Sequence, residues 1–250
     1  MKQGGFMAKT VLITGASRGI GRETARKFAL EGANVAVNYC KSADDAAAFC
    51  AELRRQGYNV LPVQADVSDR AQVQQMFAVI ERQLGSVDIL VNNAGISQQK
   101  LFTDITDDEW QHMLAVNLNG AFYCCQAVLP GMIRKKAGKI INISSVWGIS
   151  GASCEVHYTV SKAALIGLTK ALAKEMGPSG IQVNCVAPGV IDTDMNRCYD
   201  AETMRSLAEE TPLGVIGRAV DIAETILFLA SEKADFITGQ VVSPNGGFLI

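Results

Sequence analysis

The feature that most constrains the fold is a regular alternation along the 250-residue chain between short apolar runs and helix-length amphipathic segments. Seven β-branched runs are predicted to be strands: 10–14, 34–38, 60–65, 87–93, 139–144, 181–187 and 240–243. Strands that alternate with helices pair in parallel through right-handed crossovers. The alternation therefore predicts an α/β fold, a seven-stranded doubly wound parallel sheet with helices on both faces.

The segments between the strands carry helix signals. Three predicted helices, 19–31, 43–56 and 70–84, are each followed by the glycine expected after a helix C-terminus. Two longer helices are predicted at 108–136 and 153–176, and Pro130 should kink or end the first of them. The polar, irregular region 188–212 is predicted to be a loop with short helices that can close over a substrate.

Composition limits the class of protein. With 48% hydrophobic and 19% charged residues, the chain has enough apolar material for one large core, so residues 1–250 are predicted to form a single domain with a short N-terminal extension, 1–8. The formal net charge of -2 gives no broad attraction to nucleic acid or to a membrane surface. No apolar run approaches the roughly 18 residues that span a bilayer, and no signal-peptide pattern is present. We expect a cytoplasmic protein without nucleic-acid or membrane partners.

Cysteine and histidine usage argues against a metal centre. The seven cysteines, at positions 40, 50, 124, 125, 154, 185 and 198, include no Cys-x-x-Cys pair. Only two histidines occur, His112 and His157. We expect reduced thiols and no metal site.

A glycine-rich loop follows the first predicted strand and precedes a helix. Gly15, Gly19 and Gly21 would let backbone N–H groups and the positive helix end approach a pyrophosphate. A structural tight turn is the alternative reading. The strand before the loop and the helix after it favour a dinucleotide site on a Rossmann fold.

The Gly-x-x-x-Gly-x-Gly spacing resembles that of the short-chain dehydrogenases/reductases. Further matches follow in order along the whole chain: Asp66-Val67, Asn92-Asn93-Ala94-Gly95, Asn117, Ser145, Tyr158-x-x-x-Lys162, and Pro188-Gly189 with Thr193. The resemblance implies a Rossmann-fold oxidoreductase that transfers hydride to a ketone.

Tyr158 and Lys162 stand four residues apart on a predicted helix, so their side chains share one face. Alone, such a pair is most often an ordinary surface pair. A cation nearby would lower the tyrosine pKa from about 10 toward neutrality. The resemblance implies that Tyr158 donates the proton, that Lys162 also binds the nicotinamide ribose, and that Ser145, rather than the adjacent Ser144, orients the carbonyl. It also implies that Asn117 holds a proton-relay water.

The residue at the end of the second predicted strand helps to determine whether the protein prefers NAD or NADP, and an acidic residue there would favour NAD. This chain has Asn38 there, and Arg18, Lys41 and Ser42 can supply charge and hydrogen bonds to a 2′-phosphate. We therefore predict NADPH/NADP+ as the cofactor. The resemblance implies that Asp66 and Val67 contact adenine, Asn93 the adjoining ribose region and Thr193 the nicotinamide amide. Loop residues complete the cofactor set: Ser17, Ile20, Ala94, Gly95, Pro188 and Gly189.

Within the family the chain most resembles 3-oxoacyl-[acyl-carrier-protein] reductases, on the runs 139–145, 187–195 and 237–240. An acidic carrier protein would dock on basic residues, and 134–136 offer such a cluster. Ser179, however, replaces the arginine with which the family binds its carrier.

Trp147, Cys154 and Glu155 are predicted to edge the substrate opening. A carboxylate there suits a cationic substrate better than an anionic carrier arm. This stretch also resembles reductases that act on an aminopentanone group of elongation factor P. Steroid, sugar or acetoacetyl-CoA ketones, and a non-catalytic NADP-binding sensor or scaffold, remain as alternatives. The resemblance further implies a homotetramer.

Overall fold

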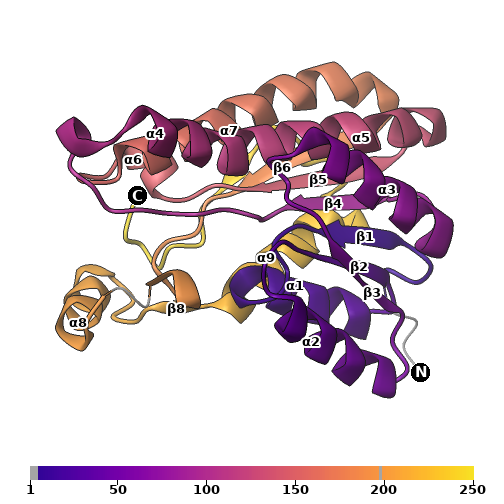
Figure 1. Cartoon of the computed structure of the whole chain (residues 1–250), viewed down its shortest axis with the longest axis horizontal. Helices are drawn as coiled ribbons and strands as arrows, with labels where there is room; N and C mark the ends of the chain where they lie inside the picture. The colour runs from indigo at the N-terminus through magenta and orange to yellow at the C-terminus, as the bar shows by residue number, and fades with distance from the viewer. Residues whose placement is uncertain (1–4, 197–198) are drawn as a thin grey trace.

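A computed structural model describes residues 5–196 and 199–250 of the chain. Its centre is one seven-stranded sheet in the order β3-β2-β1-β4-β5-β6-β9, in which every neighbouring pair is parallel (Figure 1). The strands are β1 (Thr10–Ile13), β2 (Asn34–Tyr39), β3 (Val60–Gln64), β4 (Ile89–Asn92), β5 (Gly138–Ile143), β6 (Ile181–Val186) and β9 (Val241–Val242). The predicted fold class is confirmed, and each predicted strand is present with slightly different ends.

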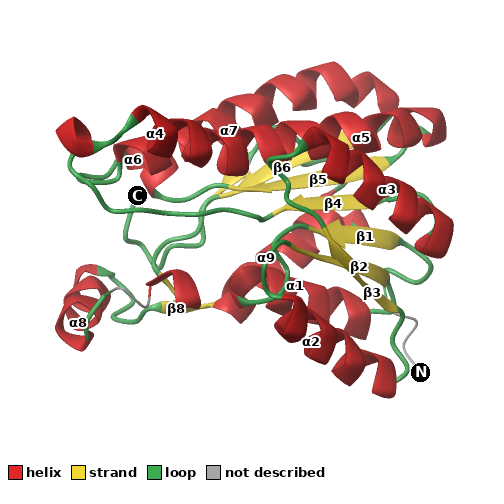
Figure 2. Cartoon of the chain, in the orientation of Figure 1, coloured by secondary structure: helices red, strands yellow, loops and turns green. Residues whose placement is uncertain are grey.

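Helices cover both faces of this sheet (Figure 2). One face carries α1 (Gly19–Leu30), α2 (Ala43–Arg55) and α9 (Ala219–Ala230). The opposite face carries α3 (Arg70–Leu84), α5 (Gly120–Lys135) and α7 (Val156–Met176). Strand order reverses between β1 and β4, so a crevice opens beyond the carboxyl ends of these strands, the usual ligand site of such sheets.

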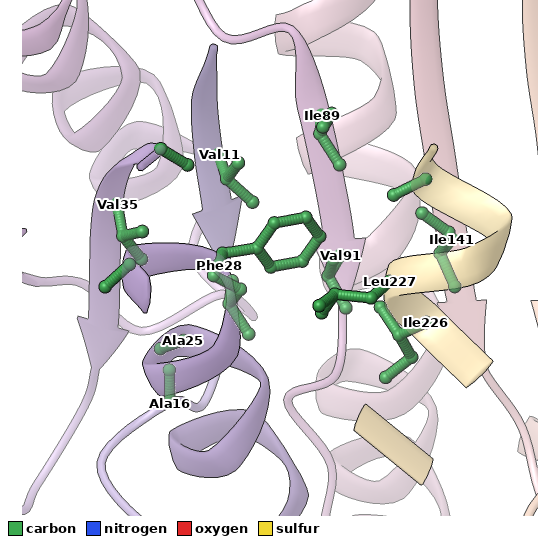
Figure 3. Packing of buried hydrophobic residues seen from close by; sticks show 14 of the residues in the cluster. Val11, Ala16, Ala25, Phe28, Val35, Ile89, Val91, Ile141, Ile226 and Leu227 are labelled. Carbon is green, nitrogen blue, oxygen red and sulfur yellow. The ribbon is translucent and has the colours of Figure 1, made fainter. Parts of the chain in front are cut away.

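The alternation of side chains along each strand builds two separate cores. In β1, Val11 and Ile13 face α1 and α9, whereas Leu12 points to the opposite core. Phe28 of α1 is fully buried and packs among side chains from the central strands and α9 (Figure 3). Because both faces are covered, the strands read as continuous apolar runs rather than as alternating ones.

Helix α9 is absent from the sequence-based prediction. Its buried residues recur at helical spacing, as in Ile222, Ala223 and Ile226, so the sequence does carry the signal. The helix begins where the Asp221 carboxylate accepts the backbone N–H of Arg218 at 2.8 Å. It completes the cover of the sheet beside α1.

The long helix predicted at 108–136 consists of three parts. α4 (Asp107–Leu114) passes into a π-helical turn (Ala115–Asn119) and then into α5. Pro130 lies inside α5, which continues to Lys135, so the predicted helix end at the proline is wrong. The widened turn instead lies at Asn117, and π-turns of this kind are frequent at functional sites.

The second long helix begins at Val156, three residues later than predicted. The short α6 (Trp147–Ser150) and a turn precede it, and Cys154 in that turn has a positive φ of 61°. The region predicted as a loop with short helices contains α8 (Ala201–Glu210), and β7 (Ile191–Asp192) pairs with β8 (Gly217–Arg218). Figure 1 shows α8 standing apart from the sheet layers.

The N-terminal extension contributes to the core through its described part. Phe6 is buried and packs edge-to-face on Phe28 with 4.9 Å between ring centroids. Residues 1–4 and Cys198 lie outside the described residues. None of the described helices combines the length and apolarity needed to cross a membrane.

Candidate active site

Two adjoining cavities lie along the carboxyl ends of the central strands. One, of about 500 Å³, contains the glycine loop and the end of β2. The other, of about 460 Å³, contains Ser145, Tyr158 and Lys162. Six residues line both cavities: Ile20, Asn93, Gly95, Ser97, Thr193 and Met195. The two cavities therefore form one continuous groove, long enough to hold an extended ligand at one end and a reacting group at the other.

The glycine loop has the geometry of an anion site. Gly15 and Gly19 adopt positive φ, and a Cβ on Gly21 would lie 2.5 Å from Nδ2 of Asn93, so a larger residue does not fit there. The helix α1 begins at Gly19, and the residue before it, Arg18, makes no side-chain capping bond. The first amides of α1 are thus left for a ligand, in the arrangement that binds phosphate at helix N-termini.

Asn38 has a different position from the one that the sequence analysis gave it. Its side chain is 1% exposed, its Oδ1 accepts the N–H of Gly15 at 3.1 Å, and its Nδ2 donates to the carbonyl of Ala65 at 3.1 Å. The amide therefore braces the glycine loop against the end of β3, although Asn38 still lines the larger cavity. The residues directly after Asn38 also line this cavity: Tyr39, Cys40 and Lys41. They are therefore further candidates for contact with the ribose or its 2′-phosphate.

The far end of the groove carries the predicted cationic and adenine-side residues. Arg18, Lys41, Ser42, Asp66 and Val67 all line the larger cavity. One Asp66 oxygen accepts bonds from the backbone and hydroxyl of Ser68, which fixes the carboxylate in the loop after β3. Among the residues predicted for the cofactor, Ser17, Ala94 and Gly95 also line this cavity, and Pro188 and Gly189 line the smaller one.

Tyr158 and Lys162 share one face of α7 inside the groove. The Lys162 Nζ lies 5.6 Å from the centroid of the Tyr158 ring and donates to the carbonyl of Ile143 at 2.9 Å. Burial raises the pKa of Tyr158 to about 12 and lowers the pKa of Lys162 to about 8. The expected lowering of the tyrosine pKa by Lys162 is therefore not found in the protein alone: burial is the main effect and raises the pKa, and the lowering contribution comes from the hydrogen bond with Ser145.

The two adjacent serines separate as the alternation of a strand requires. The Ser144 hydroxyl donates to the carbonyl of Lys162 at 2.8 Å and so is occupied within the fold. Ser145 accepts the N–H of Trp147 at 3.2 Å and lines the groove beside Tyr158. Its hydroxyl also hydrogen-bonds with the side chain of Tyr158, so the two groups point to the same place in the groove. This geometry supports the choice of Ser145 over Ser144.

Asn117 lies in the π-helical turn, behind the groove. Its Oδ1 accepts the N–H of Ile96 at 2.8 Å, and its Nδ2 donates to the Ile96 carbonyl at 2.9 Å and to the Ser161 hydroxyl at 3.0 Å. The side chain therefore holds the loop after β4 against α7. A Cβ on Gly95 would lie 3.2 Å from Lys162 Nζ and 3.4 Å from Asn117 Oδ1, which places both groups beside the same backbone.

The substrate end of the groove differs in part from the prediction. Trp147 and Glu155 line it, and Trp147 packs edge-to-face on Phe248 of the C-terminal tail, with 5.4 Å between ring centroids. Cys154 does not line it, because the residue bends the turn and its carbonyl accepts the N–H of Lys100. Further residues that line this end were not predicted from the sequence, among them Gln98, Gln99, Tyr199 and Leu207. The position of the two glutamines just after Asn93-Ala94-Gly95 was the available signal.

The basic residues considered for carrier docking lie elsewhere. Arg134 and Lys135 end α5, just before β5 begins at Gly138, and Lys135 pairs with Asp88 at 2.7 Å just before β4. This is the amino edge of the sheet, whereas Ser145 and Tyr158 are at its carboxyl edge. The proposal that 134–136 guide a carrier to the groove is therefore not supported.

Comparison with known proteins places the chain in a family. Residues 15–249 match the family model described as enoyl-(acyl carrier protein) reductase. The chain is 44% identical over 241 residues to the 3-oxoacyl-[acyl-carrier-protein] reductase FabG of Staphylococcus aureus, covering 96% of this chain and 98% of that protein. It is 41% identical over 243 residues to FabG of Aquifex aeolicus, covering 97% and 98% of the two chains.

A solved structure agrees with these sequence relatives. A gluconate 5-dehydrogenase from Burkholderia cenocepacia J2315, in complex with NADP and tartrate, superposes with a TM-score of 0.93 at 35% identity and covers 98% of this chain and 97% of its own. The fold agrees with this kinship over nearly the whole chain. The chain belongs to the short-chain dehydrogenase/reductase family.

Proposed function

We propose that the protein is an NADPH-dependent ketone reductase that reduces 3-oxoacyl-[acyl-carrier-protein] to the 3-hydroxyacyl form. The observation that carries the proposal is the convergence of Ser145, Tyr158 and Lys162 at one end of a groove whose other end is an uncapped helix N-terminus. The named activity of the FabG relatives supports the substrate, and the NADP in the gluconate dehydrogenase complex supports the cofactor.

The residues present fit a dinucleotide phosphate. Backbone amides at the start of α1 would hold the pyrophosphate, and Arg18 with Lys41 would face an additional phosphate at the far end. Lys162 keeps one N–H on the Ile143 carbonyl, so two others remain for ribose hydroxyls. When bound, NADPH supplies the hydride for the carbonyl carbon.

The protein supplies the proton and the orientation of the substrate. With a pKa of about 12, Tyr158 is protonated at neutral pH, which is the state that a proton donor to a ketone oxygen requires. Ser145, whose oxygen already accepts the N–H of Trp147, donates its proton to the same ketone oxygen. After the transfer, the Lys162 ammonium stabilises the phenolate that remains.

A panel of ketones tests this proposal. NADPH oxidation is followed with acetoacetyl-carrier protein, acetoacetyl thioesters and free ketones at equal concentrations. We expect the carrier-bound and thioester substrates to be reduced with the highest kcat/KM, and NADPH to be preferred over NADH. Cofactor binding without turnover of any ketone would instead indicate the sensor or scaffold function.

We further propose that the protein assembles as a homotetramer, with α5 and α7 at one two-fold interface and the C-terminal tail at another. Exposed apolar side chains on these helices, Phe122, Ile133 and Val160, support the first interface. Phe248 supports the second less directly, because it packs on Trp147 of its own chain. A cytoplasmic location remains a prediction of the sequence.

A further inference from the structure

We propose that Glu155 forms a subsite for a hydrogen-bond donor or a cation beside the reacting centre, and that it selects ketones which carry a hydroxyl or ammonium group within a few bonds of the carbonyl. The inference rests on the proposed ketone reductase activity and concerns which small free ketones the groove prefers, apart from the carrier-bound substrate. It assigns Glu155 to substrate selection and not to the chemical step.

Glu155 is a buried carboxylate inside the substrate end of the groove. It is 6% exposed and lines the same cavity as Tyr158 and Ser145. It is the residue directly before α7, the helix that carries Tyr158 at its third position. Burial is the main cause of the raised pKa of Tyr158, and the charge of Glu155 adds to it. The carboxylate is therefore close enough to act on a group attached to the reacting ketone.

Among the described residues, the contacts of this carboxylate are few and none of them carries a positive charge. Glu155 occupies the position before the first residue of α7, where a carboxylate normally accepts helix amides, yet its side chain makes no capping bond. Its hydrogen-bond partners are neutral: the Tyr199 hydroxyl, at 3.4 Å, and the side chain of Gln99. Among the described residues, no lysine, arginine or histidine forms an ion pair with it.

Burying a carboxylate that pairs with no cation in the described part of the chain has a high desolvation cost, and burial accordingly raises the pKa of Glu155. The positive end of α7 favours the ionised form but does not neutralise it. A ligand that brings an ammonium or hydroxyl group to this place supplies the missing partner. An alkyl group there would leave the carboxylate unpaired, and an anionic group would be repelled.

The part of the wall next to Glu155 is polar, whereas Trp147, Val190 and Leu207 make other parts of the same cavity apolar. Gln98 and Gln99 line the groove next to Glu155, and Gln99 donates to the Tyr199 hydroxyl at 2.9 Å. Gln98 is held from behind, because its amide donates to Glu109 at 2.8 Å and its oxygen lies 3.1 Å from Nε2 of the buried His157. These polar groups suit a polar substituent at the place beside Glu155.

The experiment compares matched ketones in wild type and Glu155→Gln, which keeps the shape and one acceptor oxygen but removes the charge. The substrates are 4-amino-2-butanone, 4-hydroxy-2-butanone and 2-pentanone, which differ at one terminal group, and kcat/KM is measured by NADPH oxidation. We expect wild type to favour the amino ketone over 2-pentanone by at least tenfold, and Glu155→Gln to reduce that ratio by at least tenfold. The hydroxy ketone should respond in the same direction by a smaller factor.

Glu202→Gln is the matched control, because Glu202 is an exposed carboxylate on α8 outside the groove. The ratio of kcat/KM for the amino ketone to that for 2-pentanone should be the same in Glu202→Gln as in wild type. If both variants lost the ratio equally, the preference would come from general surface charge and the proposal would be overturned. An unchanged ratio in Glu155→Gln would also overturn it and would leave Glu155 with the role of holding Tyr199. Thermal unfolding would show whether Glu155→Gln folds. If it does not, the preference of wild type for the amino ketone over 2-pentanone is the test, and a kcat/KM ratio of one or below overturns the proposal.

Acetoacetyl-carrier protein, reduced in the same assay, separates this inference from the proposed function. If the carrier substrate is reduced and the preference for the amino ketone does not change in Glu155→Gln, only the role of Glu155 is contradicted. A Glu155-dependent preference for the amino ketone without reduction of the carrier substrate would support the subsite and contradict the carrier-bound substrate.

Discussion

Burial sets the protonation of the two residues that carry the proposed chemistry. Lys162 is surrounded by protein, which lowers its pKa to about 8, and the same burial raises that of Tyr158 to about 12. A lysine is cationic below its pKa, so the charge at Lys162 is lost as the pH rises through about 8. The phenol remains protonated over that whole range.

A pH dependence of cofactor binding follows for Lys162. We expect NADPH to bind more weakly on the alkaline side, with a midpoint near pH 8, because the ammonium that would hold the ribose hydroxyls is lost there. Fluorescence titration between pH 6.5 and 10 measures the dissociation constant. Tyr158→Phe is the control and should show the same midpoint. Affinity that is constant up to pH 10 would contradict the assignment of the shifted lysine to the cofactor.

At single positions, the sequence predicted which residues belong to the site better than it predicted the contacts of their side chains. Tyr158, Lys162 and Ser145 meet in one groove because helix and strand periodicity determine which side chains share a face. The direction of Asn38 could not be predicted, because it depends on the hydrogen bonds that three segments distant in sequence complete together. The same holds for Cys154, whose positive φ turns it away from the groove.

At the scale of elements, the loop between β1 and α1 depends on the end of β2. The Asn38 amide links Gly15 to Ala65, so the cradle for the pyrophosphate is fixed before any ligand binds. Regular elements such as β1 and α3 were predictable from apolar periodicity and glycine positions. Helix α9 was missed although its spacing is helical, and the course of α5 through Pro130 depends on packing that periodicity does not reveal.

The hydrogen bonds of the Asn38 side chain predict different outcomes for substitutions at Asn38 and at nearby Lys41. Asn38→Asp removes the donor to Ala65 and places a carboxylate against backbone carbonyls, a loss of about 1–3 kcal/mol that should lower Tm by about 2–4 °C per kcal/mol. Lys41→Ala, on an exposed side chain, should leave Tm unchanged and raise the KM for NADPH by about tenfold, but not that for NADH. Thermal unfolding and steady-state kinetics measure both. If Asn38→Asp kept its Tm and turned the preference toward NADH, Asn38 would face the ribose after all.

On the scale of the whole molecule, the fold brings distant parts of the chain to one groove. The loops after β1, β4, β5 and β6 line it, and Phe248 of the C-terminal tail packs on Trp147, one of its lining residues. The parallel sheet and its two helical layers were predictable from the alternation of elements. The strand order and the path of the tail are tertiary features that local pattern does not contain.

The proposed assembly is tested by sedimentation at micromolar concentration. We expect a species about four times the 26.7 kDa chain mass. Replacing Val160, an exposed apolar residue of α7, by glutamate should split the tetramer into dimers, because a buried charge without a partner is costly at an interface. A monomer near the chain mass in wild type would contradict the proposal, and an intact tetramer in the variant would contradict the α7 interface.

The most direct test of the central claim is hydride transfer itself. Acetoacetyl-carrier protein is reduced with NADPH that carries deuterium at both C4 positions, and the product is analysed by mass spectrometry, in wild type and in Tyr158→Phe, which keeps the buried ring and removes the proton donor. We predict one deuterium at C3 of the 3-hydroxyacyl product in wild type, and turnover at least about 100-fold slower in the variant with NADPH binding retained. Product without deuterium, or a variant that keeps a tenth of the wild-type kcat, would contradict the account.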